Sequence, residues 1–225
     1  MRSASGKLIA HGEYLQIAHG EHVNARLVFH FLDGSIDDDN VNFTQDRTFR
    51  FVSEHHIQKG PFFPKPVDLT IEPNGQVTAR TTEKDGKEKV ETQHMDLPPD
   101  LSNGMVTILM LNFSPNNPQE ELSMLVPADK LRMVKLKINP DGNSSFHVNG
   151  VAHTAALFRI KIEIGGIAGV IAPIVGKKPE DVMIWMLEGE APAFIREVGQ
   201  LYSDGPKVSI ELAGTTFPRV TAAKH

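Results

Sequence analysis

The sequence predicts a mainly β protein, built as a curved antiparallel sheet or partial barrel with one or two short helices. Two observations lead to this prediction. Several segments alternate apolar and polar residues with period two, which is the pattern of a strand with one buried face. Turn dipeptides such as Asn74-Gly75 and Asp141-Gly142 separate these segments at the spacing typical of β sandwiches and barrels, about 8 to 12 residues. We therefore expect about eleven strands.

The alternation is clearest in segments 134–138, 158–164 and 207–212, where every second residue is apolar and the residues between are charged or hydroxylated. Such strands form antiparallel sheets with one face in the core and one face in solvent. Segment 181–187 differs because both of its faces are apolar, and Trp185 lies within it. We expect this strand to be covered on both sides and Trp185 to be buried.

One helix is predicted over residues 99–112, where a proline opens the segment and apolar residues follow with helical spacing. Asp100 or Ser102 can cap its N-terminus. Gly104 weighs against the prediction, because a glycine inside a helix costs about 1 kcal/mol relative to alanine.

Composition limits the possible chemistry of this chain of 225 residues, which has a net charge of -5 and no cysteine. The lack of cysteine excludes disulfides and thiolate zinc sites. The acidic balance argues against nucleic acid or an anionic membrane as a partner, since both require clustered Lys and Arg. No apolar stretch approaches the roughly 20 residues of a transmembrane segment. We expect residues 1–220 to form one β domain and residues 221–225, which carry no pattern, to be a disordered tail.

A metal site is conceivable at His94, Asp96 and Asp100, because imidazole and carboxylates suit zinc or a hard divalent ion. No further ligand converges on them in the sequence. We interpret these residues as a solvated strand end in which Asp100 caps the helix, and we expect no metal and no other cofactor.

The acidic segment 33–40 places oxygen-bearing side chains at alternate positions, as a calcium loop does. The match fails in detail, because Asp38 stands where such a loop requires glycine and Thr44 stands where it requires a bidentate glutamate. We interpret the segment as a solvated hairpin loop.

Catalytic patterns are weak. A hydrolase elbow of the type Gly-x-Ser-x-Gly does not occur. Glu188 and Glu190 share one strand face and could form a carboxylate pair, but we interpret them as the solvated rim of a turn around Gly189. Of the pair His55-His56, one side chain should face the apolar side and the other should face water. The adjacent Phe62 and Phe63 should pack against a sheet edge or form a contact site.

A binding role is predicted from segment 181–187, whose second apolar face requires a cover that the neighbouring amphipathic strands do not supply. An apolar or lipid-like ligand could provide it. The expected ligand-binding residues are Trp185, Met183 and Phe194, with Ile167 and Ile171 near the entrance. We therefore expect a ligand-binding or scaffold protein rather than an enzyme. The alternatives are a hydrolase with carboxylate or His chemistry and a structural subunit that assembles through its sheet edges, and the oligomeric state stays open.

Three blocks of sequence resemble an uncharacterised group of bacterial β proteins of the cell envelope, most of which carry export signals. The resemblance covers roughly residues 48 to 218, and its blocks are 51–60 with 64–68, 94–104, and 165–176 with Trp185 and 191–194. It implies a periplasmic or secreted protein with a curved sheet or partial barrel akin to lipoprotein-carrier folds, and it implies no known reaction. Residues 1–6 lack the apolar region of a signal peptide, so a cytoplasmic location stays open as well.

Overall fold

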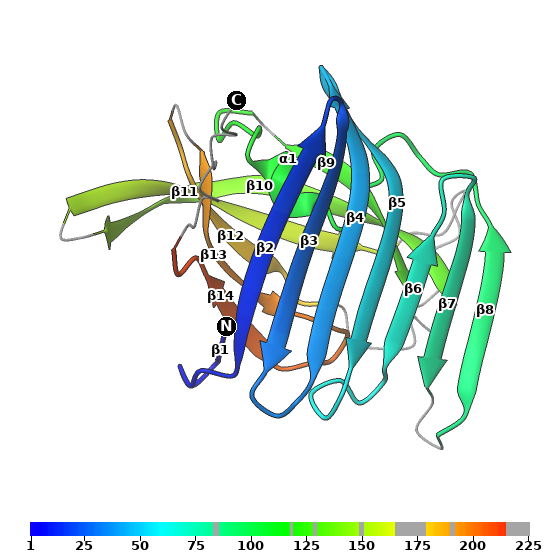
Figure 1. Ribbon diagram of the computed structural model, residues 1–225. Helices are drawn as coiled ribbons and strands as arrows, with labels where there is room; N and C mark the ends of the chain where they lie inside the picture. The colour runs from blue at the N-terminus through cyan, green and yellow to red at the C-terminus, as the bar shows by residue number, and fades with distance from the viewer. Residues whose placement is uncertain are drawn as a thin grey trace, which may run out of the picture.

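The computed structural model describes residues 1–82, 86–117, 119–127, 130–148, 151–164, 179–189 and 192–214. Its strands form two antiparallel sheets of seven strands each, which confirms the predicted fold class (Figure 1). The described strands make two separate sheets and do not close into a barrel. The first sheet has the order β1 (Arg2–Ser3), β14 (Lys207–Glu211), β13 (Ala193–Gln200), β12 (Val182–Leu187), β11 (Val151–Glu163), β10 (Leu131–Val148) and β9 (Glu120–Pro127).

The second sheet is a meander, in which strands that follow one another in the sequence are also neighbours in space. Its strands are β2 (Ala10–His19), β3 (His22–Phe31), β4 (Ile36–Asp46), β5 (Thr48–Lys59), β6 (Val67–Ile71), β7 (Gln76–Thr82) and β8 (Glu88–His94). Two of the predicted turns lie where expected. Gly34 lies in the β3–β4 turn and Gly75 ends the β6–β7 turn, both with positive φ. The turn predicted at Asp141-Gly142 is wrong, because these residues lie inside β10, where its pairing with β11 shifts.

The two sheets face each other, and in Figure 1 their strands cross at a steep angle. The β10–β11 hairpin projects beyond β2, the edge strand of the second sheet. The helix α1 (Val106–Met110) contributes Met110 to the core of the first sheet and Ile108 to a cluster on the second. The helix therefore joins the two sheets.

The predicted helix is much shorter than expected, and its predicted cap is wrong. Met105 occupies the N-cap position without a side-chain hydrogen bond. Asp100 instead accepts hydrogen bonds from Ser123 Oγ and Lys135 Nζ, and the Ser102 hydroxyl donates to the Ser123 carbonyl oxygen at 2.8 Å. These polar residues join the loop before the helix to β9 and β10, so they are not free to cap.

The prediction that Trp185 is buried is wrong: it lies on the outer face of the first sheet and is half-buried, whereas its neighbours Ile184 and Met186 point into the core. Its Nε1 donates to Ser144 Oγ at 3.1 Å, and the Arg196 guanidinium lies 5.4 Å from the centre of its ring. Both faces of β12 are thus at least partly covered by the protein itself.

Gly104 holds the loop before α1 close against β4. Its φ is +65°, and a Cβ atom there would lie 2.8 Å from Val41 Cβ.

We expect Gly104→Ala to lower the free energy of unfolding by about 3 kcal/mol, because backbone strain and a steric clash add. Urea denaturation followed by Trp185 fluorescence measures this. Gly6→Ala is the matched control, since Gly6 also has a positive φ but nothing within 4 Å, and it should cost only about 1 kcal/mol. Equal losses in the two variants would contradict the close approach.

Candidate functional site

Two apolar clusters pack against the inner face of the second sheet, on strands β2 to β5. One lies under the helix and consists of Val23, Ala25, Val41, Phe43, Met105 and Ile108. The other is aromatic and joins Phe29, Phe31 and Phe63 to Tyr202 of the β13–β14 turn. Phe62 and Phe63 therefore pack within the structure, in contact with Phe31 and Tyr202. The side chains between the two clusters are more exposed than those within them.

Between the clusters runs one row of side chains from the sheet edge inward. Tyr14 on β2 pairs with Leu27 on β3, Leu27 pairs with Asp39 on β4, and Asp39 pairs with His56 on β5. Tyr14 is 51% exposed and Leu27 is 36% exposed. On the same face of β3, the flanking Ala25 and Phe29 are 1% and 5% exposed. We call Tyr14, Leu27, Asp39 and His56 the open row, because Leu27 is open to solvent whereas the residues beside it on the same face of β3 are buried.

His56 anchors the inner end of the open row. Its Nε2 donates to Asp37 Oδ1 at 2.8 Å, and Gln58 Nε2 donates to the other oxygen of Asp37 at 3.2 Å. Gln58 also donates to the Leu201 carbonyl oxygen at 3.1 Å and so ties β5 to the first sheet. A His–Asp pair of this kind can exchange protons. Within the described residues, however, no Ser or Thr hydroxyl is hydrogen-bonded to His56, so a nucleophile is not in place.

Glu54 lies deepest in the site, with 4% of its surface exposed. Asn103, from the loop before the helix, donates to Glu54 Oε2 at 3.1 Å. The same Asn103 side chain donates to the Leu125 carbonyl oxygen and accepts from the Leu125 N–H, both at 2.8 Å. Asn103 therefore fixes Glu54 to β9 of the first sheet.

Burial favours the neutral, protonated forms of Asp39 and Glu54. Burial and the charge of the neighbouring carboxyl raise the pKa of Glu54 well above its usual range, and burial likewise raises the pKa of Asp39. Asp39 Oδ1 is buried and receives no hydrogen bond from any described N–H or O–H donor. Since two carboxylates are both acceptors, a hydrogen bond between these side chains requires that one of them be protonated.

Two further groups, His56 and Glu197, have raised pKa values. Burial disfavours the charged form of His56, but the hydrogen bond to Asp37 and the surrounding carboxylates outweigh it and raise its pKa to about 9. Glu197 faces the site from β13, and burial together with the charge of Asp37 raises its pKa to about 7. The site can therefore gain and lose protons in the physiological range.

Sequence analysis missed this cluster because it interpreted segment 33–40 as a solvated loop, which is wrong for its second half. β4 begins at Ile36, and Asp37 is buried. The signal was present in the sequence, since Asp37, Asp39, Val41 and Phe43 alternate as one strand face. His55 and His56 do point to opposite faces, as predicted. His55 is exposed and contacts Asp68 at 3.1 Å.

The predicted ligand-binding residues do not converge. Phe194 packs against the inner core of the first sheet, whereas Met183 lies on the outer face beside Trp185. Ile167 and Ile171 lie outside the described residues.

The other predicted sites are dispersed in a similar way. His94 and Asp96 are exposed at the end of β8, while Asp100 forms an ion pair with Lys135 at 3.0 Å. Glu188 is exposed, and Glu190 and residues 221–225 fall outside the described part of the chain. Among the described residues, no three His, Asp or Glu side chains are arranged to hold a metal ion.

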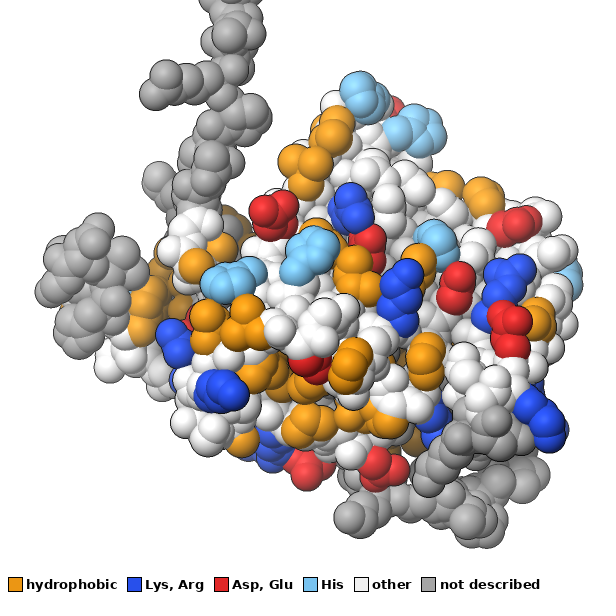
Figure 2. All heavy atoms as spheres, turned by 60° about the horizontal axis from the view of Figure 1, so that its bottom comes forward, with side chains coloured by type: hydrophobic (Ala, Val, Ile, Leu, Met, Phe, Trp, Pro, Cys, Tyr) orange, Lys and Arg blue, Asp and Glu red, His pale blue; other side chains and the backbone are white. Residues whose placement is uncertain are grey.

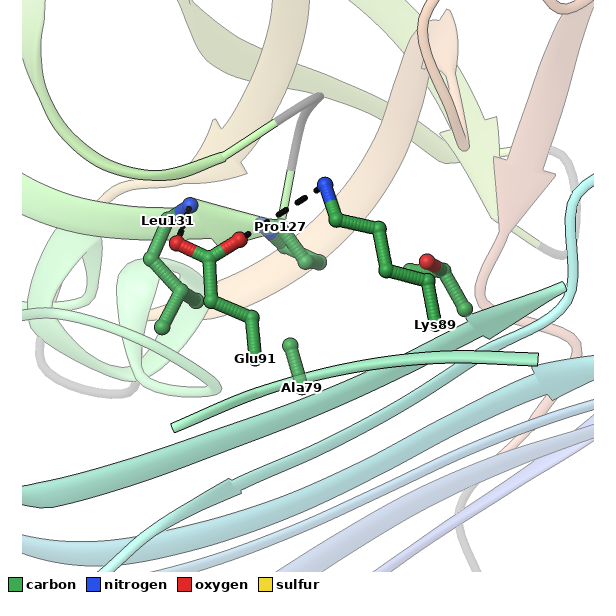
Figure 3. Close-up of a pocket in the computed structure, with 6 residues that line it drawn as sticks. Ala79, Lys89, Glu91, Pro127 and Leu131 are labelled. Atoms are coloured by element: carbon green, nitrogen blue, oxygen red, sulfur yellow. Dashed lines mark hydrogen bonds and ion pairs between the residues drawn. The ribbon is translucent and has the colours of Figure 1, made fainter. Parts of the chain in front are cut away.

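A small hollow lies where β7 and β8 meet β9 and β10 (Figure 3). Glu91 Oε1 accepts from the Leu131 N–H at 3.2 Å, and Lys89 lies 3.8 Å from the same carboxylate. Its volume is about 10 Å³, which is room for one water molecule. This hollow is a junction between the sheets rather than a ligand site.

No family model, curated protein or solved structure matches the chain. In the described part, no helix is long and apolar enough to cross a membrane. On the face seen in Figure 2, acidic, basic and histidine side chains are interspersed, and apolar side chains gather across the lower half of the view. The function must therefore be argued from the site itself.

The raised pKa values of Glu197 and His56 predict how the free energy of unfolding depends on pH. Glu197 has a pKa raised from 4.5 to about 7, so the folded state holds a proton that the unfolded state loses as the pH passes 4.5. Between pH 6.5 and about pH 9, the folded state likewise holds a proton on His56 that the unfolded state loses. We therefore expect the free energy of unfolding to be highest near pH 5 and to fall toward pH 9, by up to about 3 kcal/mol for each group.

Urea denaturation at a series of pH values measures this dependence. Glu197→Gln should flatten the curve between pH 4.5 and 7, whereas the exposed Glu188→Gln should leave it unchanged. A stability that rises steadily from pH 5 to pH 9 would contradict the protonation of this site.

Proposed function

We propose that the protein binds an amphipathic, lipid-like molecule at the open row, with the apolar part of the ligand against Tyr14 and Leu27 and its polar end at Asp39 and His56. The observation that carries the proposal is the exposure of Leu27 between two buried neighbours on the same face of β3. A side chain flanked by packed clusters, yet itself open, leaves apolar surface that a ligand can cover.

The polar end favours a ligand with a hydrogen-bond donor or a positive charge. Asp37, Asp39, Glu54 and Glu197 all contribute carboxyl groups, whereas His56 is the single cationic partner found there among the described residues. An anionic head group would meet these carboxylates without compensation. An amine or a hydroxyl would donate to them. The predicted lining by Trp185 and Met183 is not part of this proposal, since both lie on the outer face.

Competition with a neutral fluorophore such as N-phenyl-1-naphthylamine tests the proposal. We expect saturable binding of the dye and displacement by dodecylamine at least about tenfold more effective than by dodecanoate, which corresponds to about 1.4 kcal/mol. Leu27→Gln should weaken dye binding about tenfold, because it removes apolar contact area and adds an amide.

Leu15→Gln is the matched control. Leu15 is 57% exposed and lies next to Tyr14 on β2 but on the outer face, so its loss should leave binding unchanged. Absence of saturable dye binding, or an equal loss in both variants, would overturn the proposal. If Leu15→Gln instead dissociates an oligomer, the alternative of assembly through the β2 edge gains support. The periplasmic or secreted location stays a prediction from the resemblance.

A further inference from the structure

A second hollow lies on the opposite, outer face of the same sheet. It has a volume of about 260 Å³ and crosses strands β3 to β6. Its polar lining side chains are Asn24, Asn40, Asn42, Ser53, His55 and Thr70. None of these residues belongs to the open row, so this site is separate from the one proposed above.

The hollow has two causes in the strand pairing. β6 pairs with β5 only from Glu54 to Gln58, so Thr48 to Ser53 of β5 have no neighbour on that side. The pairing of β4 with β5 also shifts between Asn42 and Phe43, which leaves Val52 as an extra residue. Such a bulge bends the strand and changes the direction of nearby side chains. The surface therefore steps down beside Asn42 and Ser53.

The amide side chains are fixed by one another before any ligand arrives. Asn24 Nδ2 donates to Asn40 Oδ1 at 2.6 Å and to Asn42 Oδ1 at 3.0 Å, and Asn42 Nδ2 donates to Ser53 Oγ at 3.0 Å. Both N–H groups of Asn24 are used in this network. Among the described residues, Asn24 Oδ1, Asn40 Nδ2 and the Thr70 hydroxyl have no partner, so acceptors and donors stand side by side at fixed positions.

The charge of the hollow selects the ligand class. No Lys or Arg lines it, which disfavours phosphate and carboxylate ligands. His55 is engaged by Asp68, and Glu72 is the one acidic side chain at the rim that is turned outward, since Glu54 points into the core. Amides and hydroxyls that both donate and accept match hydroxyl groups, which do the same.

We propose that this hollow binds a neutral, hydroxyl-rich molecule of the size of one sugar ring, such as a terminal saccharide unit. Its volume lies below the range of about 300 to 1,000 Å³ that drug-sized ligands occupy, which limits the occupant to a single ring. Among the described residues no Phe, Tyr or Trp lines the hollow, so we expect weak binding, with a Kd of about 1 mM to 10 mM.

Titration of ¹⁵N-labelled protein with N-acetylglucosamine, glucose and galactose tests the inference. We expect saturable shifts of the Asn24, Asn40 and Asn42 side-chain amide signals with at least one sugar. Asn40→Asp should weaken binding at least about fivefold, because it removes a donor with little change in shape. Asn42→Ala is the second variant, in case the new carboxylate disturbs the fold.

Thr92→Ala is the matched control, since Thr92 lies on the same outer face but beyond the hollow, next to Thr78. It should leave sugar binding unchanged, and so should Leu27→Gln, which separates this site from the open row. No saturable shift up to roughly 100 mM of any of the three sugars would overturn the inference. Stronger shifts with inorganic phosphate than with sugar would overturn the ligand class.

Discussion

The packing between the two sheets depends on a cluster of buried carboxyl groups and on the way each of them is stabilised. An isolated ionised carboxylate inside a protein is very costly, so buried carboxyls remain neutral, pair with a cation or accept several hydrogen bonds. All three solutions occur here. Asp37 pairs with His56 and also accepts a hydrogen bond from Gln58, and burial raises the pKa of Glu54 and so favours its neutral form. The partners come from β5 and, with Asn103 donating to Glu54, from the loop before the helix, so the cluster fixes how the loop and the sheet meet.

The open row follows from the same constraint. Apolar side chains fill the inner face above and below it, but an apolar filling over Asp39 and His56 would strand their remaining polar atoms. The packing therefore divides into a cluster under the helix and an aromatic cluster around Phe63. Tyr14 and Leu27 lie in the division and stay exposed. The exposed apolar side chains Tyr14 and Leu27 therefore lie next to the polar groups of Asp39 and His56.

The sequence predicted the antiparallel β class and the main turns, because alternation and Asx-Gly dipeptides are local signals. It also predicted the opposite directions of His55 and His56. It did not predict the site, since a run of acidic residues after Asp33-Gly34 looks like a solvated loop unless the pairing across β3, β4 and β5 is known. The helix was predicted to be longer than it is for a similar reason. Asp100 and Ser102 are good caps locally, and only the distant Ser123 explains why they are used elsewhere.

The two proposed sites are the two faces of one short piece of β4. Asp39 and Val41 point inward to the core, while Asn40 and Asn42 point outward to the hollow, because side chains alternate along a strand. A register slip of one residue would exchange these faces and bring asparagine amides under the helix and carboxylates into solvent. The bulge after Asn42 absorbs Val52 as one extra residue of β5, so that Phe51 faces inward opposite Phe43. The bulge thus serves both faces at once: it preserves the apolar packing under the helix and forms the step on which the outer amides gather.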